Sequence, residues 1–309
     1  MRPEEWIGSV TTRFGEKEQG LSRLSSGELL VEAIAQNPNA WLGPQHHAAF
    51  GASTEILVKL LDPEQRLPVH FHPDKRFSKT HLSLNHGKTE AWIILEAPKG
   101  AGVGLGFAEE VNKQQVATMV SNRDSQGLLA SLARHEVRTG DTVLVPAGTP
   151  HAIDSGIFIL ELQEPTDLSA LLEWNDFAVD GTKNGHLGLG FDVVLDALHL
   201  KPIHKELIPQ LVLHDRLAES SRQSLFTHEA DPYFRAEYIN GVGDPIEAGF
   251  SIFLILEGQG IINFESAQSF DVSKGDAIII PWCAGSWNVV GVQGIMCRPP
   301  LPQDAIRAL

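Results

Sequence analysis

The sequence predicts a mainly β protein with two barrels side by side and a small helical insertion in the first. Short apolar runs of strand length are bounded by glycine and proline, which favours many short strands. A strand-and-turn pattern of the first half recurs in the second half. We therefore expect a first domain at 1–180 with the insertion at about 97–138, a connector at 181–215 and a second domain at 216–309.

The first element expected is a helix. Ser25 and Glu28 form a capping-box pattern ahead of an apolar helical repeat, and this helix should end near Asn37-Pro38. Strands then dominate the first half of the chain. Their apolar runs cover 55–61, 67–71, 91–95, 142–145 and 157–163.

The insertion and the connector supply further short elements. Two helical patterns follow one another in the insertion, with apolar positions Val116, Met119 and Val120 in one and Leu128, Leu129 and Leu132 in the other. The glycine-rich stretch 181–190 lacks the strand before it and the lysine after it that a phosphate-binding loop requires. We expect an ordinary loop there, followed by a short helix at 191–198.

The second half repeats the first in a weakened form. Residues 253–257 (FLILE) match 92–96 (WIILE), and 275–281 (GDAIIIP) match 140–146 (GDTVLVP). In this alignment Ser251 stands where the first half has Glu90, and Ser286 stands where it has His151. We expect a second, degenerate domain of the same type, without metal ligands.

Composition and charge exclude several classes of protein. The 309 residues are 42% hydrophobic and 20% charged, which is ordinary for a folded protein. A formal charge of −15 argues against nucleic-acid binding. Two cysteines give no disulfide framework, and the start of the chain has no apolar signal segment. No run approaches the ~20 apolar residues of a membrane span, so we expect a cytoplasmic protein; its oligomeric state is left open.

The most informative residues form the pattern of a divalent-metal site. His70 and His72 lie two apart on an extended segment, so their side chains leave one face. Glu90 opens a strongly apolar strand, where a buried carboxylate needs a partner. His151 follows an apolar strand and a tight Pro-x-Gly corner. We predict that these four residues share one ion.

The donor set leaves the identity of the ion open. Three imidazoles and one carboxylate suit Zn, Fe, Ni, Co or Mn, and the lack of further carboxylates argues against a dedicated Ca or Mg site. Four protein ligands close a tetrahedral zinc site. A catalytic role therefore requires that the ion expand its coordination to accept a substrate.

Two stretches carry a resemblance to known families. The pattern Gly-x5-Pro-x-Gly-x2-His from Gly140 to His151 resembles a signature of the cupin barrel, a jelly roll that holds a metal. With the segments 6–9, 57–62, 69–74 and 87–95, the chain resembles class I mannose-6-phosphate isomerases, which are zinc-dependent enzymes with two cupin-type jelly-roll barrels. The resemblance covers most of residues 1–165.

The family resemblance implies particular roles for residues of this chain. It implies zinc ligands at His70, His72, Glu90 and His151, with His70 in place of the family's usual glutamine. An arginine that the family carries beside its substrate falls on Leu171. Leucine cannot form the guanidinium fork that suits a phosphate, so another cation would have to bind one.

The resemblance implies an aldose-ketose isomerase that acts on a sugar or sugar phosphate, with zinc as the expected metal. Such a reaction moves a proton between C1 and C2 through an enediolate. Lys88 is our candidate for orienting or protonating the substrate oxygens, and Glu173, beside Trp174, is a weaker candidate base. The alternatives are an isomerase of unphosphorylated sugars, a non-catalytic sugar-binding or regulatory cupin, and an iron-dependent oxygenase with two histidines and a carboxylate.

Overall fold

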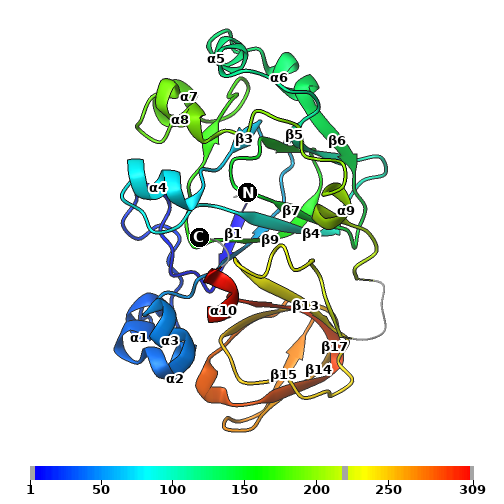
Figure 1. Cartoon of the computed structure of the whole chain (residues 1–309). Coiled ribbons are helices and arrows are strands. Elements are labelled where there is room, and N and C mark those ends of the chain that lie inside the picture. Colours follow the sequence, from blue (N-terminus) through cyan, green and yellow to red (C-terminus); the bar gives the residue numbers. More distant parts are fainter. Residues whose placement is uncertain (1–3, 218–221, 307–309) are drawn as a thin grey trace. The chain divides into compact units, whose positions relative to one another are not determined.

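The computed structural model describes residues 4–217 and 222–306 and is mainly β, as predicted (Figure 1). The chain divides into two compact units. Unit 1 comprises the residues up to Glu4 and Leu60–His214, and unit 2 comprises Glu5–Lys59 and the chain from Asp215 onward. The division falls within β1 (Glu4–Ile7) and β2 (Leu57–Leu61).

The units differ from the predicted domain ranges at both ends of the first domain. Residues 5–59 group with the second half, where Gly8 lies against the side chains of Ile252 and Ile279. The end of the predicted connector groups with the first half, because β11 (Val212–Leu213) pairs with β7 (Thr142–Val145). Both contacts are distant in sequence and leave no local pattern from which to predict them.

Two sheets carry the strands of unit 1. The first has the strand order β1-β2-β9-β4-β7-β11, and the second has the order β10-β3-β8-β5-β6 with antiparallel pairing throughout. The remaining strands are β3 (His70–Phe71), β4 (Glu90–Glu96), β5 (Gly102–Phe107), β6 (Leu132–Glu136), β8 (His151–Ile153), β9 (Phe158–Gln163) and β10 (Ala170–Leu171). The helices of this unit are α4 (Lys75–His81), α5 (Lys113–Ser121), α6 (Ser125–Ser131), α7 (Gly181–Asn184), α8 (Phe191–Val194), η1 (Leu195–Ala197) and α9 (Ile208–Leu211).

The predicted helical insertion is only partly helical. Helices α5 and α6 are present as predicted, but β5 and β6 flank them and belong to the second sheet. β5 alternates glycine with apolar residues, and glycine is depleted in strands, so its sequence gave a poor strand signal. A Cβ on Gly104 would lie 2.6 Å from the Leu132 side chain, which explains the glycine. Because β5 pairs with β8, this segment helps to place His151.

The first helix is present, but its predicted cap is wrong. α1 (Leu30–Gln36) begins after Leu29, which forms no side-chain cap. Ser26 Oγ instead accepts a hydrogen bond from the Glu28 amide at 3.4 Å, ahead of the helix. The helix ends at Asn37, as predicted, and α2 (Pro38–Leu42) and α3 (Pro44–Phe50) follow, each with proline in its first turn.

Unit 2 contains one six-stranded antiparallel sheet with the order β12-β13-β17-β14-β15, and β16 pairs with β14. Two register shifts interrupt the pairing of its two longest strands, β14 and β17, and such irregularities bend a sheet. Its elements are β12 (Gln223–Ser224), β13 (Arg235–Ile239), β14 (Ser251–Phe264), β15 (Phe270–Ser273), β16 (Ala277–Ile280), η2 (Trp282–Ala284), β17 (Trp287–Arg298) and α10 (Pro302–Ala305).

The predicted internal repeat has the same strand pairing in both units. In unit 1, β4 pairs with β7 so that Glu90 lies opposite Val145. In unit 2, β14 pairs with β16 so that Ser251 lies opposite Ile280. The residues aligned from sequence thus occupy the same register in each pair, and Ser251 stands at the position of Glu90.

Among the residues that the structure describes, no helix has both the length and the apolar character needed to cross a membrane.

We expect the aromatic core of unit 2 to dominate its stability. The Phe253 side chain is fully buried and packs 5.4 Å from the Trp287 ring, so Phe253→Ala should cost about 3–5 kcal/mol in the free energy of unfolding. Val290 is 49% exposed on the same sheet, and Val290→Ala should change stability by less than about 0.5 kcal/mol. Urea unfolding followed by fluorescence measures both, and equal losses would contradict this assignment of the core.

Candidate metal centre

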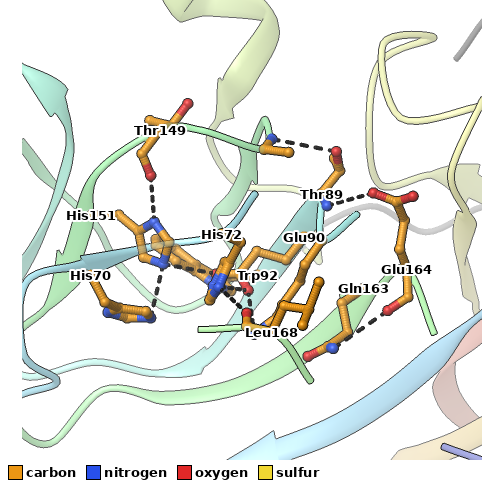
Figure 2. A network of polar contacts seen from close by, with 12 residues as sticks. His70, His72, Thr89, Glu90, Trp92, Thr149, His151, Gln163, Glu164 and Leu168 are labelled. Carbon is orange, nitrogen blue, oxygen red and sulfur yellow. Dashed lines mark hydrogen bonds and ion pairs between the residues drawn. The ribbon is translucent and has the colours of Figure 1, made fainter. Parts of the chain in front are cut away.

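Three imidazoles and one carboxylate converge between the two sheets of unit 1 (Figure 2). His70 lies in β3 and His151 opens β8, the neighbouring strand, where the two residues are directly paired. His72 follows β3 and lies on the same face as His70, as the two-residue spacing predicted. Glu90 opens β4 in the other sheet. The sequence-predicted ligands are therefore brought together.

Backbone carbonyls fix the tautomer of all three imidazoles. A carbonyl oxygen only accepts hydrogen bonds, so each Nδ1 that contacts one must carry a proton. In a neutral ring, Nε2 then presents a lone pair to the centre of the site. The Nδ1 contacts are His70 to Pro68 O at 2.7 Å, His72 to Leu168 O at 2.6 Å and His151 to Thr149 O at 2.8 Å.

The spacing of the four acceptors fits one small cation. His70 Nε2 lies 3.0 Å from His151 Nε2. Glu90 Oε2 lies 2.9 Å from His72 Nε2, and Glu90 Oε1 lies 3.3 Å from His151 Nε2. Tetrahedral ligands at metal bond lengths of 2.0–2.1 Å are separated by about 3.3–3.4 Å. These atoms lie close to the positions that such an ion requires.

Two of the inward-facing atoms form no hydrogen bond within the site, although Glu90 Oε2 has an ion-pair contact with Lys88. His72 Nε2 and Glu90 Oε2 are buried, and neither forms a hydrogen bond with any residue that the structure describes. They approach within 2.9 Å of one another, but a lone pair facing a carboxylate oxygen is repulsive. A cation between them would satisfy both atoms, so the residues present fit a metal ion.

Burial keeps the ligands in their metal-binding protonation states. Desolvation, with the nearby His151 and His72, holds the pKa of His70 well below its ordinary value. Desolvation and the Lys88 cation lower the pKa of His72 to about 3. For Glu90, burial favours the neutral acid, but Lys88 and the two nearest histidines outweigh it and depress the pKa. The imidazoles of His70 and His72 are therefore neutral and the Glu90 carboxylate is ionised at neutral pH.

Lys88 reaches the same site. Its side chain is buried, and Nζ lies 3.1 Å from Glu90 Oε2 in an ion-pair contact. Burial disfavours the ammonium, but Glu90, Glu161 and Asp167 together raise the pKa of Lys88. The Lys88 amide donates to Pro73 O at 3.0 Å, which fixes the loop beside His72. Lys88 is therefore a charged donor held within the site.

Glu173 lies close to the site, but its carboxylate contacts Arg66 and the backbone of Val69. Its buried carboxylate forms a two-point ion pair with Arg66 and accepts a hydrogen bond from the Val69 amide at 2.6 Å. Both carboxylate oxygens are engaged in these contacts and are not free to contact a substrate. We therefore do not retain Glu173 as a candidate base.

Leu171 lies beside the metal centre. β10 pairs with β3 so that Leu171 is directly opposite His70, and directly paired residues of antiparallel strands share a face. A continuous row thus crosses the second sheet from half-buried Leu171 through His70 and His151 to buried Leu105. The wall beside His70 is apolar.

Sequence reasoning missed the groups that orient the ligands. Trp92 Nε1 donates to Glu90 Oε1 at 3.0 Å and fixes the carboxylate. Trp92 is two residues from Glu90 on one strand, so the alternation of side chains could have identified it. The three orienting carbonyls have no signal in the sequence, since any residue type can supply them.

We expect His151→Ala to lower metal affinity by at least tenfold, because it removes one of the four converging acceptors. The matched control is His228→Ala, since the His228 side chain is 73% exposed and lies in unit 2. Competition with a chromophoric chelator gives both affinities. Equal affinities in the two variants would remove His151 from the ligand set.

Comparison with known proteins gives consistent results, although no family model matches the chain. Mannose-6-phosphate isomerase ManA of Bacillus subtilis is 29% identical over 263 residues, covering 80% of this chain and 77% of that protein. Mannose-6-phosphate isomerase of Streptococcus mutans is 29% identical over 257 residues, covering 80% and 76%.

Solved structures share the fold. The crystal structure of mannose 6-phosphate isomerase from Bacillus subtilis superposes with a TM-score of 0.67 at 22% identity, over 96% of this chain and 88% of that one. A mannose 6-phosphate isomerase bound with zinc and yttrium gives a TM-score of 0.68 at 15% identity, over 97% and 91%. The chain is therefore similar in sequence to curated mannose-6-phosphate isomerases and shares the fold of solved structures of such enzymes.

Proposed function

We propose that this protein is a metal-dependent mannose-6-phosphate isomerase that interconverts mannose 6-phosphate and fructose 6-phosphate. The observation that carries the proposal is the set of acceptors at residues 70, 72, 90 and 151, of which all but the half-buried His70 are buried and whose lone pairs converge without protons between them. The curated relatives bear the name of this activity.

The metal ligands in this proposal are His70, His72, Glu90 and His151. Three imidazole nitrogens and one carboxylate oxygen form a donor set that suits zinc, and a structural relative is described as bound with zinc and yttrium. A divalent ion held there would polarise the sugar carbonyl and the neighbouring hydroxyl as a Lewis acid. The backbone carbonyls bound to the histidine Nδ1 atoms, and the Trp92 side chain bound to Glu90, orient the ligand atoms toward the centre of the site.

Lys88 has the role of a hydrogen-bond donor in this mechanism. Its raised pKa keeps the proton on Nζ at neutral pH, so it cannot accept the proton that leaves the sugar carbon. A charged donor buried beside Glu90 can instead bind a sugar oxygen and stabilise negative charge that develops on it. This agrees with the role proposed for Lys88 from the sequence.

We also propose that both units are cupin-type jelly rolls, the second of them degenerate. In unit 1 the two sheets face one another across the ligand cluster, as a jelly roll requires. The shared register of β4 with β7 and of β14 with β16 supports a common origin for the two units.

One observation favours a second candidate, an isomerase of unphosphorylated sugars. Leu171 is an apolar residue paired with His70, and its side chain can form neither a hydrogen bond nor an ion pair with a charged phosphate. Phosphate binding therefore depends on a cation elsewhere around the site, and the two candidates differ in the substrate that they turn over.

Ketose formation should be measured with zinc-loaded protein on mannose 6-phosphate and, in parallel, on free mannose. We expect turnover of mannose 6-phosphate that chelation abolishes and zinc restores. Turnover of mannose alone would select the second candidate. Absence of turnover on both sugars, with metal bound, would contradict an isomerase.

We expect Lys88→Gln to lower kcat by about 10²–10³-fold, the usual effect of losing a donor that stabilises developing negative charge. Lys79→Gln is the control, because Lys79 is an exposed lysine of the nearby helix α4 and should leave kcat unchanged. Metal content is measured in both variants. An unchanged kcat for Lys88→Gln at full metal occupancy would exclude a catalytic role for Lys88.

A further inference from the structure

We propose that Glu173, paired with Arg66, is a positioning residue that fixes the strand carrying His70 and so sets the position of one metal ligand. The inference rests on the proposed metal centre and adds a role that the ligand set does not include. The Glu173 carboxylate is fully buried and binds the backbone of Val69, the residue before His70.

Glu173 binds the backbone immediately before His70. Its Oε1 accepts the Val69 amide hydrogen at 2.6 Å. In return, Val69 O accepts the amides of Leu172 at 2.9 Å and Glu173 at 3.3 Å. Every polar backbone atom of Val69 is thus held by Leu172 and Glu173. We call these hydrogen bonds of Val69 with Leu172 and Glu173 the clamp. Because β3 is only two residues long, its own strand pairing fixes the backbone weakly, and the clamp adds to it.

Arg66 extends the clamp to the other side of Pro68. The guanidinium pairs with both oxygens of Glu173, at 2.9 Å for the Nη2 to Oε2 contact, and Nη1 donates to Leu67 O at 3.2 Å. The same ion pair therefore holds the residues on both sides of Pro68, at Leu67 and at Val69.

Pro68 connects the clamp to the ligand. Its carbonyl accepts the Nδ1 hydrogen of His70 at 2.7 Å, which aims Nε2 at the centre of the site. The pyrrolidine ring restricts the backbone at Pro68, so this carbonyl has little freedom once its two neighbours are fixed. Successive contacts from Arg66 to Glu173, from Glu173 to Val69 and from Pro68 to His70 thus set the position of His70 Nε2.

A buried ion pair is better suited to fixing a position than to adding stability. Removing two charges from water costs about as much as their attraction returns, and apolar replacement of such a pair is often neutral or stabilising. The Arg66 side chain is 29% exposed and that of Glu173 is fully buried, so the desolvation cost falls mainly on the carboxylate. The hydrogen bond to Val69 is what an apolar pair would lose.

Two double variants separate positioning from stability. Arg66→Met with Glu173→Gln removes both charges but keeps a side-chain acceptor for the Val69 amide. Arg66→Met with Glu173→Leu removes the charges and the acceptor. We expect zinc affinity within about threefold of wild type for the first and a loss of about tenfold or more for the second, the usual cost of losing an outer partner of a ligand.

Chelator competition gives the zinc affinities, thermal unfolding without metal reports the stability of both variants, and the visible spectrum of the cobalt-loaded protein reports ligand geometry. We expect a changed cobalt spectrum in the leucine variant alone. Introduced into His70→Ala protein, the leucine pair should cause no further loss of zinc affinity, because its target is gone. Two results would overturn the proposal. One is an equal loss of zinc affinity in both double variants, and the other is a loss of zinc affinity from the leucine pair in His70→Ala protein that is as large as in wild type.

A single variant covers the case in which the leucine pair does not fold. Glu173→Gln should retain zinc affinity and kcat within about threefold, since the amide oxygen still accepts from Val69. A loss of kcat of about 100-fold or more at full zinc occupancy would instead make Glu173 a base and overturn the proposal. The metal readouts need no sugar turnover. Normal wild-type zinc affinity without isomerase activity would therefore contradict the proposed function and leave the role of Glu173 intact.

Discussion

The site in unit 1 depends on one electrostatic constraint, the convergence of four acceptors that carry no protons between them, three of them buried and the fourth, on His70, half-buried. Each imidazole donates a hydrogen bond from Nδ1 to a backbone carbonyl. The Nε2 lone pairs and the Glu90 carboxylate therefore face one another, with contacts of 2.9–3.3 Å. Such a cluster is repulsive unless a cation occupies its centre. The surrounding strands, the donation from Trp92 and the ion pair with Lys88 all hold this arrangement against that repulsion.

The residues at equivalent positions of the two units, Glu90 and Ser251, have different hydrogen-bonding partners. In unit 1, Glu90 Oε1 accepts a hydrogen bond from Trp92 and Oε2 pairs with Lys88, and both oxygens also lie near the lone pairs of the histidines. In unit 2, Ser251 stands at that register and accepts a hydrogen bond from Arg298 Nε at 2.9 Å, while Arg298 also donates to Glu247 O. A guanidinium satisfies the position internally, so unit 2 retains the strand pairing without the donor set of a metal site.

Features that depend on neighbouring residues could be predicted from the sequence. Features that depend on contacts between distant segments could not. The period-two histidines, the carboxylate at the mouth of a buried strand and the Pro-x-Gly corner each carry their chemistry in neighbouring residues, and the structure brings them together. β5 was missed because glycines occupy alternate positions, and the reason for one of them, Gly104, is the Leu132 side chain across the sheet. The pairing of Glu173 with Arg66 could not be predicted, because the two residues are 107 positions apart in the sequence.

The most direct test of the account is X-ray absorption at the zinc edge of the metal-loaded protein. The account predicts a first shell of three imidazole nitrogens and a carboxylate oxygen at about 2.0–2.2 Å, with the outer-shell scattering that imidazole rings produce. A sulfur shell at about 2.3 Å, or a shell of oxygen atoms without imidazole scattering, would contradict the ligand set and with it the proposed site.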